Sequence, residues 1–290
     1  MLLNKENFGS YNLYTIKTDR FKTCHVEIIF RNNVVPEELT IRNVLFDTLL
    51  ESNKNYQTNR LLNIKLEELY NASIYTITNK VGNMLLTNFC IDFLTPKYSE
   101  EKIVEDSFKL LFDLIFNPLT SNNEFDKSTV DYVKTKLESE IKSIIENPRK
   151  IAIIDALKTL GDTPTSYEAS GNLNDLNKIN NCNLHDYYEK TIQNDYIDIY
   201  VIGNLDMEKV SKIIKKYQKF EVIKNHDITV YTKEEKRKLI KEHKDTNYFQ
   251  TNLVFLLNLN NLTEHEKNYV ANIYNIILGG GSLQTKLSKK

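Results

Sequence analysis

The hydrophobic period changes repeatedly along this chain, and those changes limit the folds that it can adopt. Where apolar and polar side chains alternate, a strand with two unlike faces is predicted; where apolar side chains recur every three or four residues, a helix is predicted. The segments with strand period are residues 11–16, 25–30, 72–78, 84–93 and 197–203. The segments with helical period are residues 38–50, 58–70, 99–115, 124–145, 149–160, 183–191 and 207–217. We therefore predict one domain of mixed helices and strands over residues 1–220.

A segment of mixed charges interrupts this pattern at residues 221–246. It contains Lys233-Glu234-Glu235-Lys236-Arg237-Lys238 and has little apolar periodicity. A basic run can mark a nucleic-acid site, but here both signs are interleaved, which is typical of a solvated segment. We interpret residues 221–246 as a linker.

The pattern of elements starts again beyond the linker. A strand is predicted at 251–257, a helix at 264–278 and a turn at Gly279-Gly280-Gly281, in the order already seen at 25–53. We predict that residues 247–290 begin a second domain related to the first. Because so short a domain cannot bury a core of its own, we expect the sequence to be truncated relative to a longer protein.

Charge and cysteine content exclude several classes of partner and compartment. The 38 Lys and Arg against 39 Asp and Glu leave a net charge of -1, which gives no electrostatic reason to expect nucleic acid or an anionic membrane as partner. Three widely spaced cysteines, Cys24, Cys90 and Cys182, suit a reducing compartment better than a disulfide framework. No leader segment and no apolar run of about 18 residues is present. We expect a cytoplasmic protein.

No common catalytic or metal motif occurs in the sequence. The five histidines are scattered, and no two lie within five residues of each other. No cysteine belongs to a Cys/His cluster with zinc-site spacing, and we find neither a Gly-rich phosphate loop nor a Gly-x-Ser-x-Gly elbow. We therefore expect no bound metal and no cofactor, and we expect His25 and His185 to be structural or exposed.

Three stretches of the chain resemble the insulinase/pitrilysin family of zinc peptidases. They are Val44 to Ser52 followed by Leu66 to Ala72, then Gly171 to Ile179 leading into the strand that ends Val201-Ile202-Gly203-Asn204, and finally Ile276 to Ser282. Their order and spacing extend over nearly the whole chain. The resemblance implies an α+β fold like that of the mitochondrial processing peptidase, in which a mainly antiparallel sheet is flanked by helices on one face. It also implies the start of a second homologous domain.

The catalytic motif of that family is degenerate here. The family carries H-x-x-E-H on a helix, where two histidines bind zinc and the glutamate is the general base. The resemblance places Asn43, Phe46 and Asp47 at these positions and Glu140 at the third ligand. Asn43 is a poor ligand, Phe46 cannot accept a proton, Asp47 alone cannot hold zinc, and Glu140 is expected to be a solvated surface residue. The chain is thus identified as an inactive member.

What an inactive member does is also implied by the resemblance. Many relatives pair a motif-bearing subunit with a degenerate one, and active members bind substrate as an additional strand on a sheet edge. That edge strand is expected at Asn71, Ala72, Ser73, Ile74 and Tyr75. Three functions remain open: the non-catalytic half of a heterodimeric peptidase, whose partner is a motif-bearing subunit or the chain itself; a stand-alone binding or scaffold protein; and an active zinc peptidase with unconventional ligands. Bacterial degenerate members associated with aminopentanol modification of elongation factor P are the most similar, which connects the scaffold function with that modification.

Overall fold

The structure is a computed structural model that describes residues 3–222, 252–256, 259 and 261–279. The chain divides into two compact units, Met1–Tyr231 and Thr232–Lys290, and the division falls inside the segment interpreted as a linker. Each unit is described by itself. None of the helices in the described residues is long and apolar enough to cross a membrane.

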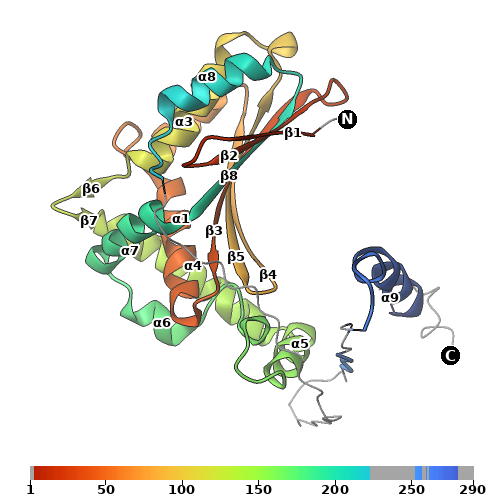
Figure 1. The fold of residues 1–290 in the computed structure, drawn as a ribbon. Coiled ribbons are helices and arrows are strands. Elements are labelled where there is room, and N and C mark those ends of the chain that lie inside the picture. Colours follow the sequence, from red (N-terminus) through yellow and green to blue (C-terminus); the bar gives the residue numbers. More distant parts are fainter. Residues whose placement is uncertain (1–2, 223–251, 257–258, 260, 280–290) are drawn as a thin grey trace. The chain divides into compact units, whose positions relative to one another are not determined.

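A six-stranded sheet forms the centre of the first unit, with strand order β1-β2-β8-β3-β5-β4 (Figure 1). The strands are β1 Leu3–Asn7, β2 Asn12–Lys17, β3 Thr23–Asn33, β4 Ser73–Val81, β5 Met84–Leu94 and β8 Tyr196–Gly203. All neighbouring pairs are antiparallel except β2 and β8, which run parallel. The predicted mainly antiparallel sheet is therefore confirmed. Strand β1 was not predicted, because all five of its side chains are exposed and it shows no apolar alternation.

Eight helices lie in the described residues of the first unit, and all but α6 follow predicted segments closely. They are α1 Leu39–Glu51, α2 Asn59–Glu68, α3 Lys102–Phe116, α4 Lys127–Glu146, α5 Pro148–Lys158, α6 Leu173–Lys178, α7 Asn181–Asn194 and α8 Met207–Tyr217. Figure 1 shows these helices on one face of the sheet. The core lies between the two layers: alternate residues of β3, such as Val26, Ile28 and Phe30, meet the apolar stripes of α1 and α3.

Local capping explains where α4 begins. The sequence predicts a helix from residue 124, but β6 Thr120–Ser121 and β7 Glu124–Phe125 form a small hairpin there. Asp126 then caps the helix, since its carboxylate accepts a hydrogen bond from the Thr129 amide at 2.9 Å. The Asp126 cap thus sets the start of α4 at Lys127, three residues after the start that periodicity predicts.

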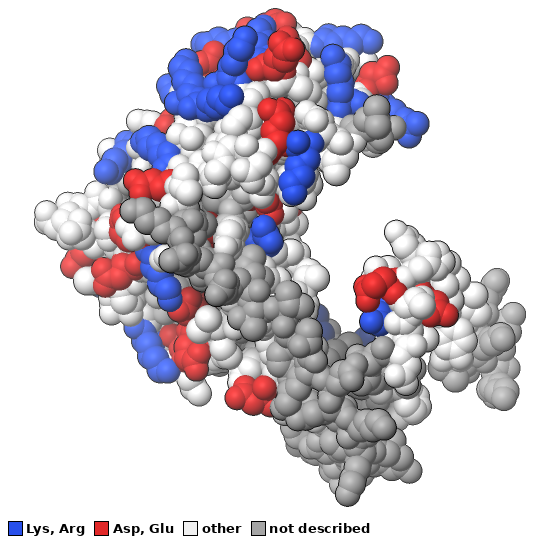
Figure 2. Space-filling view, viewed as in Figure 1, with Lys and Arg blue, Asp and Glu red and all other residues white. Residues whose placement is uncertain are grey.

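The charged side chains of α3 and α8 are paired with one another. Figure 2 shows Lys and Arg beside Asp and Glu over these helices, and Lys209 Nζ lies 3.1 Å from Glu101 Oε2. Lys216 Nζ lies 2.6 Å from Glu105 Oε1 in the same way. This surface therefore carries no single-signed patch of the kind that binds a polyanion.

The second unit contains a helix but no strand in its described residues. A π-helical turn, Glu266–Val270, continues into α9 Ala271–Gly279, which agrees with the helix predicted at 264–278. The strand predicted at 251–257 is wrong over the described residues 252–256, which form none. A strand is stable only when paired, and no described residue pairs with this segment. Gly280, Gly281 and most of the linker lie outside the described residues.

Candidate functional site

The resemblance places the degenerate motif on α1, and its three residues make different contacts. Asn43 is used structurally: its side-chain amide donates to the carbonyl oxygens of Leu39 and Ala169, each at 2.8 Å. The same loop is held to α1 at Thr40, whose Oγ1 accepts a hydrogen bond from the Asn172 amide at 3.0 Å. The donors of Asn43 are therefore occupied in tying α1 to the segment before α6.

Phe46, which the resemblance places at the family's general base, lies in the hydrophobic core. Its side chain is 1% exposed, and its ring meets the Phe30 ring edge-on with centroids 4.9 Å apart. An aromatic ring there contributes packing and cannot activate water.

Asp47 is held by a hydroxyl and an ammonium group. Thr76 Oγ1 donates to its carboxylate at 3.1 Å, and Lys136 Nζ lies 3.6 Å from it. Burial works to lower the pKa of Lys136, but the carboxylates of Asp47, Glu140 and Glu51 outweigh it and raise that pKa. Glu140 itself is exposed on α4. The ammonium group of Lys136 therefore supplies the positive charge beside the carboxylates of Asp47, Glu140 and Glu51.

Arg42, one residue before the motif, makes a buried polar network that sequence reasoning missed. Its guanidinium is 1% exposed and donates to Thr87 Oγ1 at 2.6 Å, to the Phe30 carbonyl and to the Asp195 carboxylate. Burial alone would lower the pKa of Arg42, and the Asp195 carboxylate raises it instead. One signal was present in the sequence: Arg42 lies on the same helical stripe as Leu39, Leu45 and Phe46, where a charge is unexpected.

The predicted edge strand is β4, and its position differs by two residues from the prediction. Tyr70 and Asn71 have positive φ angles of 58° and 56°, so the chain turns there, and Ala72 is buried before the strand begins at Ser73. Asn71 and Ala72 are therefore not strand residues, whereas Ser73, Ile74 and Tyr75 are. In the described part of the chain β4 pairs with β5 alone, which places it at the sheet edge.

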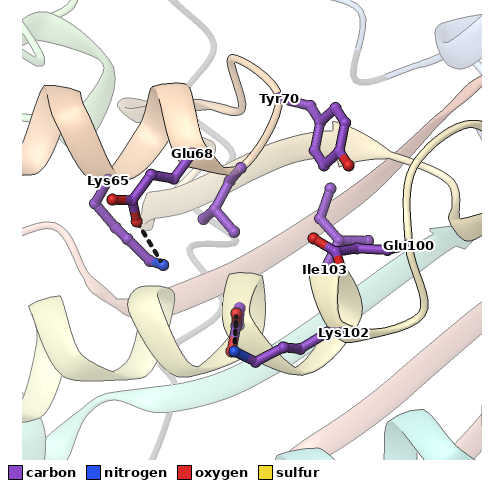
Figure 3. Close-up of a pocket in the computed structure, with 8 residues that line it drawn as sticks. Lys65, Glu68, Tyr70, Glu100, Lys102 and Ile103 are labelled. Atoms are coloured by element: carbon purple, nitrogen blue, oxygen red, sulfur yellow. Dashed lines mark hydrogen bonds and ion pairs between the residues drawn. The ribbon is translucent and has the colours of Figure 1, made fainter.

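Two hollows lie in the helical layer of the first unit. One of about 230 Å³ lies between α2 and α3, and Figure 3 shows its charged side chains. Those charges are largely paired, since Lys65 Nζ lies 3.2 Å from Glu68 and Lys102 Nζ lies 3.5 Å from Asp106. A second hollow of about 430 Å³ lies beside Glu140, between α4 and α5. Neither combines apolar walls with convergent polar groups, the arrangement typical of small-molecule sites.

Comparisons with known proteins point to inactive peptidases. Residues 178–290 match the family model described as Peptidase M16 inactive domain. The chain is 26% identical over 222 residues to the protein of Bacillus subtilis (strain 168) named "Probable inactive metalloprotease YmfF". That alignment covers 75% of this chain and 52% of the relative.

Solved structures share the fold. A conserved protein from Enterococcus faecalis V583 superposes with a TM-score of 0.77 at 21% identity, over 82% of this chain and 57% of that one. The first half of the periplasmic protease PqqL from Escherichia coli gives a TM-score of 0.62 at 12% identity, over 80% of this chain and 49% of that one. The chain spans about half the length of these relatives.

The resemblance to the insulinase-type peptidases is thereby confirmed, and so is the expected loss of catalysis. The sequence contains no H-x-x-E-H, and Phe46, which the resemblance places at the motif's glutamate, is a buried ring. The chain is therefore similar to inactive members of the M16 zinc peptidases, through the family model matched by residues 178–290 and through a relative named as a probable inactive metalloprotease.

Proposed function

We propose that this chain belongs to the non-catalytic half of an M16-type assembly and holds an extended peptide on strand β4. The observation that carries the proposal is the edge of β4, which has no partner strand among the described residues and lies beside α1. Thr76 of β4 donates a hydrogen bond to Asp47 of α1, so the edge strand is tied to the helix on which the resemblance places the degenerate motif. A surface that keeps its edge strand after losing its catalytic groups is suited to binding without cleavage.

The side chains of β4 support binding of an additional strand. In an antiparallel pair, alternate residues of an edge strand direct their N–H and C=O groups away from the sheet. Ile77 and Val81, on the face away from the helices, are 42% and 61% exposed, so apolar side chains accompany the free backbone groups. Main-chain hydrogen bonds would supply sequence-tolerant affinity, and these side chains would supply modest selectivity.

We propose a motif-bearing M16 subunit as the partner, because the degenerate chain has no hydrolytic group of its own. The test is a photo-crosslinking amino acid placed at Ile77 in the full-length protein, expressed in its native cells. The matched control is the same amino acid at Ile153, which is 40% exposed and belongs to helix α5 instead of the sheet edge.

We expect the Ile77 probe to capture a subunit with an intact H-x-x-E-H helix, or a peptide held by that pair, and the Ile153 probe to capture neither. Capture of a second copy of this chain would indicate a homodimer in place of the proposed heterodimer. Equal labelling at both positions, or none at Ile77, would contradict a ligand on β4 and favour a scaffold protein unrelated to proteolysis.

A further inference from the structure

Four side chains that can ligate a metal meet on the face of the sheet opposite the helices. His25 and Glu27 are two residues apart on β3 and therefore share a face. Cys90 lies opposite Glu27 on β5, and Asp92 lies opposite His25 in the same register. Figure 1 shows β3 and β5 as neighbours in the middle of the sheet. Residues about 65 positions apart in the sequence are brought together only by strand pairing.

The distances suit a small ion. The nearest ligand atoms of His25, Glu27 and Cys90 all lie within 4.8 Å of one another. The His25 Nε2 atom lies 4.0 Å from Glu27 Oε2, and the Cys90 Sγ atom lies 3.9 Å from Glu27 Oε1. Tetrahedral zinc with bonds of about 2.0–2.3 Å brings its ligands to about 3.3–3.8 Å from one another. Side-chain movements of about an ångström would therefore bring the three ligand atoms to the distances of a tetrahedral zinc site.

Neighbouring side chains already orient these ligands. Asp92 Oδ1 lies 2.8 Å from His25 Nδ1, which fixes the ring and leaves Nε2 facing Glu27. Asn88 donates a hydrogen bond to Glu27 Oε1, and the Tyr75 hydroxyl of β4 lies beside Asp92 and Cys90. A carboxylate on the far nitrogen of a histidine is the usual outer-shell partner in zinc sites.

We propose that His25 Nε2, the Glu27 carboxylate and Cys90 Sγ form a site for one Zn²⁺ ion, with Asp92 as the positioning residue for His25. A nitrogen, an oxygen and a sulfur donor together favour zinc over Mg²⁺ or Ca²⁺, which prefer oxygen alone. Cys90 binds as the thiolate and releases its proton to solvent. Three protein ligands leave a fourth position for water or for a donor from a bound partner.

This site is separate from the degenerate motif. Thr76 faces α1 and Asp47, whereas its neighbour Tyr75 faces Cys90 and Asp92, because successive residues of β4 point to opposite faces of the sheet. The sheet thus lies between the two positions. The proposed zinc site therefore does not depend on the proposed role of β4 in peptide binding.

The test is zinc binding by the full-length protein, purified under reducing conditions and stripped with a chelator. Metal content is measured after dialysis against Zn²⁺, and affinity by competition with a chromophoric chelator. Co²⁺ serves as a second probe, because a thiolate ligand gives a charge-transfer band and a tetrahedral site gives intense d–d bands. We expect one zinc per chain, the thiolate–cobalt band, and a zinc-dependent rise in the unfolding temperature.

Two ligand variants and two matched controls complete the experiment. Asp92→Asn, which removes an outer-shell partner, should weaken zinc binding by roughly 10- to 100-fold. Cys90→Ser and His25→Gln, which remove ligands, should each weaken zinc binding by more than that. Cys182→Ser and His185→Gln, which change the same residue types on α7, should leave affinity unchanged. Circular dichroism checks that each variant folds.

Two outcomes would overturn the proposal. One is a wild-type protein that takes up no zinc and gives no thiolate–cobalt band, which would make the cluster an ion-pair network only. The other is zinc binding that survives in the Cys90→Ser/His25→Gln double variant, which would place the metal elsewhere on the chain. The cobalt spectrum of the wild-type protein keeps the test decisive even when a ligand variant fails to fold.

Discussion

The buried pair of Arg42 and Asp195 shows how one residue of α1 is held in the core. The guanidinium reaches Asp195, the residue before β8, and both side chains are almost fully buried. A second contact comes from Asn32, whose amide donates to the other oxygen of Asp195 at 2.7 Å. The network joins α1, β3 and β8, which are distant in sequence.

Replacement of Asp195 by alanine should be strongly destabilising. The Arg42 guanidinium would be left buried without its counter-ion, so we expect the free energy of unfolding to fall by about 3–5 kcal/mol. Urea unfolding followed by circular dichroism measures the change. The control is Glu101→Ala, which breaks an exposed ion pair with Lys209 and should cost no more than about 1 kcal/mol. Similar costs for the two variants would contradict the importance of burial.

Restoring the family motif should not restore catalysis. In Asn43→His/Phe46→Glu/Asp47→His, the new glutamate replaces a core ring packed on Phe30, so we expect a loss of at least about 3 kcal/mol of stability. Peptide cleavage is measured with and without chelator, and no chelator-sensitive activity is expected. Asn43→His/Asp47→His, which keeps Phe46, is the control and should be more stable. A folded triple variant that cleaves peptide would contradict this prediction, because the three motif side chains would then be all that the chain lacks for catalysis.

At the scale of single elements, the N-cap of α4 gives a pH-dependent prediction. Hydrogen bonds from the Ser128 hydroxyl and the Thr129 amide hold the pKa of Asp126 below its ordinary value. The carboxylate therefore stabilises the helix fully above the pKa of an unfolded aspartate, and this contribution is lost as the pH falls through the folded-state pKa. Asp126→Ala should cost about 1 kcal/mol at pH 7 and much less in acid.

The control for this prediction is the neighbouring cap of α5. Asn147 accepts hydrogen bonds from the amides of Arg149 and Lys150 but does not titrate. Asn147→Ala should therefore cost about the same at both pH values. Denaturant titrations of the two variants at neutral and acidic pH measure the difference. A pH-independent cost for Asp126→Ala would show that its charge does not contribute.

Proline substitution separates the two sides of strand β4. Ile74 and Ile77 are three residues apart, so their N–H groups point in opposite directions, one toward β5 and one toward the free edge. We expect one proline variant to lose about 1–3 kcal/mol through the broken ladder bond and the other to keep stability but lose extended-peptide binding. Each proline variant is compared with alanine at the same position in thermal unfolding and peptide-binding assays. If both variants fold and still bind peptide, β4 is not the binding edge.

At the scale of the whole molecule, the hydrophobic core belongs to the first unit. Every residue of the main core cluster lies between Tyr11 and Phe220, and none of the described residues of the second unit is buried. Residues 1–231 expressed alone should therefore unfold cooperatively, with a midpoint close to that of the whole chain. Residues 232–290 alone should show no cooperative transition, because they lack a core. Calorimetry of both fragments tests this. A fragment 1–231 that fails to fold would make the second unit an essential part of the domain.

The sequence by itself indicated most of the helices and strands and the absence of the family's catalytic motif. Periodicity is a local property, so the helices from α1 to α8, apart from the unpredicted α6, appear within a few residues of their predicted bounds. The loss of the H-x-x-E-H motif is equally visible, because that motif lies within five consecutive residues.

Only the tertiary structure decided which distant residues meet. Strand order and register are set by contacts across the whole unit, and they place Cys90 beside Glu27 and Asp195 beside Arg42. The exposed strand β1 carries no apolar signal, and the edge position of β4 depends on which strands pair rather than on its own residues. The proposed zinc site therefore lay beyond sequence analysis: its ligands are spaced by strand pairing and not by a local motif.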